Sequence, residues 1–234
     1  MFQIKDHKFA VTITLLAGIF WSLGPYVVRN IDLSSNVPWQ YLFTRGIVIF
    51  LLLNLFLFFE EGKYFYKNYF KIGISGIIGG VGLGIAMTTF IWSITNTTAA
   101  ITLLCLAAMP FITALLGFLF LKEQISINVW ISIAIATFGI GVMASDTTGT
   151  NSIIGLLFGL ASALGFSVFS VSLRWKKETP KFTTVAIAGI FCCLLSYIML
   201  KYNNQPLLSS NKNEALFAVH GTLVCLGLIL YSMG

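Results

Sequence analysis

Apolar residues occur along the chain in long blocks that short polar segments separate. Residues 72–121 contain no Lys, Arg, Asp, Glu or His, a run of fifty. A single helix of that length would extend about 75 Å, whereas the hydrocarbon core of a bilayer is about 30 Å thick. The run must therefore fold back, and its only polar cluster, residues 93–98, marks the turn.

Eight such blocks are present, and each has about the length that crosses a membrane as a helix. None shows the alternation over about ten residues that is typical of a barrel strand. The sequence therefore predicts an all-α fold, a polytopic transmembrane helical bundle. The predicted spans are residues 9–28, 38–59, 72–92, 97–121, 127–144, 153–173, 182–200 and 215–233.

The composition agrees with this class. Of the 234 residues, 57% are hydrophobic and only 9% are charged, whereas soluble domains have about 25% charged residues. These values exclude a soluble enzyme, a nucleic-acid-binding protein and a secreted disulfide scaffold. The four cysteines lie in apolar blocks, which predicts free thiols. With only two histidines and no Cys/His cluster at ligand spacing, we expect no metal site and no cofactor.

The basic residues predict the orientation, because Lys and Arg concentrate in cytoplasmic loops. With a cytoplasmic N-terminus, ten of the 14 basic residues lie inside, one lies within a span, and three lie outside, namely Arg29, Lys201 and Lys212. This predicts a multi-pass protein of the cell (inner) membrane and accounts for the net charge of +6 without a nucleic-acid partner. A signal peptide is the alternative for the first span, but the run continues to Val28 without a small-x-small cleavage site.

The chain also contains a weak internal repeat. Its copies are five spans apart, so corresponding spans cross the membrane in opposite directions, as in inverted-repeat secondary transporters. We therefore predict a first five-helix repeat over residues 9–145 and three helices of a second over 153–234. Ten spans would complete the pattern, so we expect either a fragment or a partner, another copy or another chain, that supplies two helices. The repeat pairs Leu16, Gly18, Leu23 and Gly24 with Leu157, Gly159, Leu164 and Gly165 (offset 141), and Gly76, Gly82 and Leu83 with Gly221, Gly227 and Leu228 (offset 145).

Several local stretches, taken in order, resemble the EamA-type members of the drug/metabolite transporter superfamily. The resemblance implies ten helices in two five-helix repeats and the transport of small organic metabolites. The stretches are residues 15–22 with Trp21, residues 42–46 with Arg45, the Pro110-containing stretch 107–117 followed by 121–123, and residues 130–142.

Arg45 is the sharpest single feature, because an arginine about seven residues inside a span, roughly 10 Å deep, is costly unless it faces a cavity or a partner. No Asp or Glu lies inside any predicted span to neutralise it. We expect either a contact for an anionic or carboxylate-bearing substrate, or snorkelling to headgroups or a structural bond to free carbonyls.

Other residues are candidates for the substrate pathway. Gly24 and Pro25 interrupt the first span, and broken helices line substrate sites in transporters. Trp21 lies one turn earlier, while Thr88 and Trp92 share a face of the third span. Packing or lipid-facing roles are the alternative for these side chains.

His220, about six residues into the last span, is either a proton relay or a hydrogen-bonded packing residue. Gly76, Gly80 and Gly84 share one face of the third span and predict a helix-packing surface. No cluster of catalytic residue types is present, so we do not expect an enzyme. The sequence predicts an alternating-access transporter of small organic solutes, the alternatives being a non-transporting membrane subunit and, less favoured, a membrane-embedded enzyme.

Overall fold

The computed structural model describes residues 7–30, 37–145, 153–209 and 211–233, and these residues form helices and no strand. The prediction of an all-α fold is confirmed. The helices are α1 His7–Ser22, α2 Gly24–Arg29, α3 Val37–Glu61, the short 3-10 helix η1 Gly62–Tyr64, α4 Lys67–Lys71, α5 Gly73–Asn96, α6 Ala99–Leu106, α7 Met109–Leu121, α8 Ile127–Ser145, α9 Ile153–Trp175, α10 Lys181–Tyr202 and α11 Asn211–Met233.

Seven segments of the described chain are helical, long enough and apolar enough to cross a membrane. The fifth predicted span corresponds to α8, whose described apolar part, Ile127–Gly139, is shorter than the others. The multi-pass architecture is therefore confirmed, with seven of the eight predicted spans meeting the length criterion. The seven segments are Phe9–Val28, Pro38–Tyr64, Gly73–Asn96, Ala99–Leu121, Ile153–Trp175, Lys181–Tyr202 and Lys212–Met233.

Two of the spans are broken at the prolines that the sequence contains. The first span divides at Leu23 into α1 and α2, and Pro25 lies in the first turn of α2. The fourth divides between Leu106 and Met109, with Pro110 in the first turn of α7. Proline lacks a backbone N–H, so it is tolerated in a first turn, where that group has no intrahelical acceptor. The predicted interruption of the first span is confirmed.

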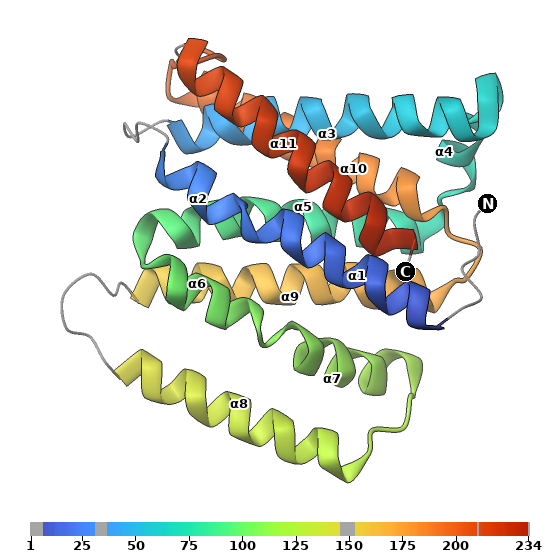
Figure 1. Ribbon diagram of the computed structural model, residues 1–234, viewed down its shortest axis with the longest axis vertical. Helices are drawn as coiled ribbons and strands as arrows, with labels where there is room; N and C mark the ends of the chain where they lie inside the picture. The colour runs from blue at the N-terminus through green and yellow to red at the C-terminus, as the bar shows by residue number, and fades with distance from the viewer. Residues whose placement is uncertain (1–6, 31–36, 146–152, 210, 234) are drawn as a thin grey trace. The chain divides into compact units, whose positions relative to one another are not determined.

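The chain forms two compact units, and residues 1–76 and 179–234 make up the first. Within it, α3 packs along α10 and α11, and α1 lies beside α11 (Figure 1). At the crossing of α3 and α10, a Cβ built on Gly46 would lie 2.7 Å from the Gly189 carbonyl oxygen, and one on Gly189 would lie 2.9 Å from that of Gly46. Because neither residue carries a Cβ, the two backbones approach closely at this point.

Residues 77–178 make up the second unit. There α6 and α7 pack against α9, and α8 lies next to α6 and α7 (Figure 1). A Cβ on Gly165 would lie 2.6 Å from the Gly82 carbonyl oxygen, and Ser162 Oγ donates to the Ala86 carbonyl at 2.8 Å. These contacts bring α5 and α9 together. The predicted repeats, 9–145 and 153–234, divide the chain differently from these compact units, and that assignment remains a prediction.

The predicted packing glycines of α5 are all buried, and their role as one packing surface remains a prediction. Gly76 belongs to the first unit, where a Cβ would lie 3.1 Å from atoms of both Thr179 and Thr184. Gly80 and Gly84 belong to the second unit. The close contact with α9 is made by Gly82, which lies between them in sequence and was not among the three predicted positions.

Candidate functional site

Arg45 lies on α3 in the first unit and is only 2% exposed. Its Nη1 donates to the Tyr41 hydroxyl at 3.1 Å, and its guanidinium carbon lies 5.3 Å from the centre of the Tyr41 ring. The two residues are four positions apart, which places them on one face of the helix. Arg45 is therefore held inside the unit rather than extended toward its surface, and its role in the substrate pathway remains a prediction.

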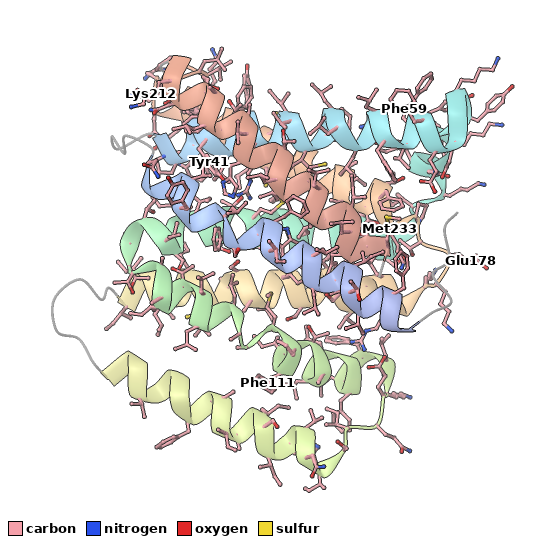
Figure 2. The ribbon with its side chains drawn as sticks, viewed as in Figure 1. Tyr41, Phe59, Phe111, Glu178, Lys212 and Met233 are labelled. Carbon is pink, nitrogen blue, oxygen red and sulfur yellow. The ribbon has the colours of Figure 1, made fainter. Side chains whose placement is uncertain are left out.

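Tyr41 connects Arg45 to the last helix. Its hydroxyl shares a hydrogen bond with Nδ1 of His220, which lies on α11 and is 1% exposed. Phe217, one turn earlier on α11, packs edge-on against the Tyr41 ring with ring centres 5.3 Å apart. Figure 2 shows the labelled Tyr41 in the part of α3 that α11 crosses. The sequence predicted Arg45 and His220 as separate candidates, and the structure joins them in one buried polar chain.

The interruption of the first span lies against the other side of His220. A Cβ built on Gly24 would be 2.7 Å from Nε2 of the imidazole, so only a glycine fits there without displacing the ring. Gly24 is the first residue of α2. The Pro25 side chain lies outside the described residues, so its predicted place in the pathway stays a prediction. The helix break and His220 thus form one local structure.

Trp21 packs farther along α11. Its ring centre lies 5.7 Å from that of Tyr231, and a Cβ on Gly227 would lie 2.7 Å from Trp21 Cδ1. Gly227 therefore provides the space that the indole occupies. These contacts are those of a packing side chain, which was the alternative for Trp21. Its role as a wall of the substrate pathway remains a prediction.

Thr88 and Trp92 lie on α5 in the second unit. Thr88 Oγ1 donates to the Gly84 carbonyl at 2.9 Å, within its own helix. The Trp92 ring lies 6.3 Å from that of Phe158 on α9. Both side chains have local contacts inside their unit, and their predicted roles in the substrate pathway remain predictions.

The expectation that no Asp or Glu lies inside a membrane-spanning helix is wrong, because a carboxylate does occur within one of the helical segments long enough to cross a membrane. Glu214 lies in the first turn of α11, which begins at Asn211, four residues before the predicted span. Its Oε2 accepts from Thr44 Oγ1 at 2.7 Å, and its Oε1 accepts from the Ser209 backbone N–H. Thr44 adjoins Arg45, so Glu214 places a negative charge near the same part of α3.

Sequence reasoning missed two residues of this region, Tyr41 and Glu214. Tyr41 had a usable signal, because it lies four residues before Arg45 on the same helical face. Glu214 was excluded by the predicted span boundary. Within the described residues, no group of three His, Cys, Asp or Glu side chains has an arrangement that could hold a metal ion. The chemistry available to Arg45, Tyr41 and His220 is hydrogen bonding and positive charge.

Comparison with known proteins agrees with this architecture. Residues 8–145 match the EamA-like transporter family. A Helicobacter pylori protein named "Uncharacterized transporter" is 26% identical over 86% of this chain and 67% of its own length. The Bacillus subtilis "Uncharacterized transporter YojE" is 22% identical over 99% of this chain and 78% of its own.

A solved crystal structure has a similar fold, with a TM-score of 0.62 and 17% sequence identity over 98% of this chain and 79% of the other. The family match covers more than half of the chain, and the helices have the length and apolar character that a membrane-embedded transporter requires. The chain therefore belongs to the EamA-like transporter family and is a multi-pass membrane transporter.

Proposed function

We propose that the chain is a secondary carrier that moves small organic anions across the cell membrane by alternating access, with Arg45 as the contact for the anionic group. The observation that carries the proposal is the position of Arg45. A charged guanidinium in the hydrocarbon region costs at least about 2.5 kcal/mol on insertion scales, so it is retained where it meets a partner or a ligand. The guanidinium fork suits a carboxylate, which accepts two parallel hydrogen bonds from it.

The crossing of α3 and α10 supports the alternating-access part of the proposal. Gly189 follows Gly46 by 143 residues, between the offsets of 141 and 145 that relate the other repeat positions. The two glycines also contact each other reciprocally in the first unit. Equivalent positions of two inverted repeats meet in this way only near the axis that relates the repeats. A carrier whose repeats rock about that axis is the mechanism that such repeats imply.

The test does not require the substrate to be known beforehand. The full chain is reconstituted in liposomes, which are incubated with a uniformly ¹³C-labelled bacterial metabolite extract, and the solutes retained inside are identified by mass spectrometry. We expect at least one organic anion to enter wild-type proteoliposomes and to be reduced at least tenfold with Arg45→Gln. The control is Lys201→Gln, which removes a positive charge from an exposed position at the end of α10.

A wild-type profile identical to that of empty liposomes, from protein that is folded by circular dichroism, would contradict the proposal and favour a subunit that transports only with a partner. Entry of neutral or cationic solutes alone would keep the carrier and remove Arg45 as an anion contact. Equal entry in the wild type and the Arg45→Gln variant would also remove it.

A further inference from the structure

A small pocket lies in the first unit, where the end of α3 meets the start of α10. Its volume is about 20 Å³, and residues of α3, α4 and α10 line it. A cavity needs about 10–15 Å³ to hold one water molecule, so this pocket has room for a single water or a single dehydrated ion. The lining residues with an oxygen in the side chain are Glu60, Glu61, Asn68 and Thr183.

Two of these side chains have a buried oxygen without a hydrogen-bond partner. Thr183 is 0% exposed, and its Oγ1 forms no hydrogen bond with any residue that the structure describes. Oε2 of Glu60 is likewise buried and unpartnered in the described part of the chain. Such oxygens destabilise a fold unless something satisfies them. Because both residues line the same pocket, one small ligand in it would satisfy both atoms.

The charges around the pocket indicate what that ligand is. Glu60 and Glu61 contribute two carboxylates, whereas Lys181 contributes one ammonium group, which donates to the Ser232 carbonyl at 3.0 Å. Among the described residues, no basic side chain forms an ion pair with Glu60. The ionised lining therefore has one negative charge in excess, which a water molecule would leave unbalanced and a monovalent cation would neutralise.

The other lysines near this end of α3 are directed elsewhere. Lys63 and Lys67 are exposed, and their ammonium nitrogens lie 5.5 Å and 4.8 Å from the centre of the Tyr64 ring. Neither is among the residues that line the pocket. Glu61 is held at the rim, because its Oε2 accepts from Nδ2 of Asn68 at 2.6 Å. The pocket is thus lined by ordered oxygen-bearing groups from α3 and α4, together with Thr183 of α10.

We propose that this pocket binds one monovalent alkali cation between Glu60, Asn68 and Thr183. Carboxylate, amide and hydroxyl oxygens are the ligands that hard cations prefer. The end of α3 at Glu61 adds to this preference, since a helix C-terminus attracts positive charge. The site departs from the expectation of no metal, which rested on the spacing of Cys and His. It joins α3 to α10 and does not depend on the proposed carrier function.

Thermal unfolding of the purified full chain in detergent, followed by circular dichroism, tests the site. Sodium chloride and potassium chloride are each compared with N-methyl-D-glucamine chloride at equal ionic strength, because this organic cation is too large for the pocket. We expect the wild-type midpoint to be at least about 2 °C higher in one of the alkali salts, since a ligand that binds only the folded state stabilises it.

Thr183→Val separates a cation ligand from a hydroxyl that is merely buried. Valine has the same shape without the oxygen, so in N-methyl-D-glucamine chloride this variant should unfold at or above the wild-type midpoint. In the alkali salt it should lose the increase that the wild type shows, and so should Glu60→Gln. The controls are Thr137→Val and Glu178→Gln, which change exposed residues and should retain the full increase.

Each variant decides the location of the cation without the other. An increase that persists in Thr183→Val or in Glu60→Gln would place the cation elsewhere and overturn the proposal. Equal wild-type midpoints in the three salts would overturn it as well and leave a pocket that holds water. An increase in magnesium or calcium chloride but in neither alkali salt would refute the monovalent site. The carrier function stands in all these cases, because its test uses Arg45 and solute entry.

Discussion

Gly24 is the backbone position against which the His220 imidazole packs, and it provides a test of the site at a single residue. A Cβ there would lie 2.7 Å from Nε2 and 3.2 Å from Cε1, so Gly24→Ala must displace the ring or the start of α2. We expect a loss of about 1–3 kcal/mol in unfolding free energy, the usual cost of overpacking a filled interior. Thermal unfolding in detergent, followed by circular dichroism, measures it.

Gly18 on the neighbouring helix is the matched control, since a Cβ there meets nothing within 4 Å. Gly18→Ala should be neutral or stabilise the helix by up to about 1 kcal/mol. The cost of Gly24→Ala should fall when His220→Ala is combined with it, because the two changes act on one contact. Additive effects in the double variant would show that the Gly24–His220 contact is not the cause.

Among single residues of the site, the sequence identified the arginine and the histidine, which are rare in apolar spans, and missed the tyrosine, which is common there. Arg45 and His220 stood out because ionisable side chains seldom occur in apolar spans. Tyr41 did not, because tyrosine is ordinary in a membrane helix, although its spacing to Arg45 was readable. The pairing of Tyr41 with His220, which are 179 positions apart, depends on how α3 and α11 pack, and no local pattern contains that information.

The helix breaks were predictable at the scale of elements, and the helix faces were not. Pro25 and Pro110 each begin a new helical segment, as the missing N–H of proline requires. By contrast, the apolar residues of α3 and α10 are not confined to one face of either helix, because lipid and protein interior both accept such residues. Periodicity therefore could not show which glycines make contacts, and the predicted set of α5 omitted Gly82.

The reciprocal contact between Gly46 and Gly189 gives a prediction for a whole helix pair. Gly46→Ala or Gly189→Ala would force α3 and α10 apart, since each Cβ would lie within 3 Å of the partner's carbonyl oxygen. We expect each variant to lose about 1–3 kcal/mol of unfolding free energy. The combined variant should lose less than the sum, because once the helices separate the second methyl group costs little.

Gly139→Ala is the control for this helix pair, because a Cβ at Gly139 meets nothing within 4 Å. Its unfolding midpoint should not decrease. If Gly46→Ala proved as harmless as Gly139→Ala, the close approach of α3 and α10 would be refuted, and with it the support that this crossing gives to rocking repeats.

For the molecule as a whole, the sequence predicted the class and the approximate spans because both follow from the match between apolar length and bilayer thickness. The compact units could not be predicted in the same way. The first unit joins residues 1–76 to residues 179–234, so it depends on contacts between distant helices rather than on any linker or composition change in the chain. The orientation in the membrane is likewise a property of the whole chain, and it remains a prediction.

The first unit offers two positions that test this orientation, because they lie at opposite ends of antiparallel α3 and α10. Near the end of α3, Glu60 and Asn68 line a small pocket together with the start of α10. At the start of α3, Gln40 donates hydrogen bonds to the Pro206 and Leu208 carbonyls, which lie beyond the end of α10. Lys67 is exposed at the first of these ends, and Asn203 is exposed at the second. Ten of the 14 basic residues lie on the side of Lys67 in the predicted topology, so that end should face the cytoplasm.

A membrane-impermeant maleimide applied to intact spheroplasts should label Asn203→Cys and should label Lys67→Cys only after permeabilisation. The native cysteines provide a low background, because three of the four are buried. The opposite labelling pattern would place the N-terminus outside, and equal labelling of both variants would show a mixed topology that the asymmetry of charge does not control.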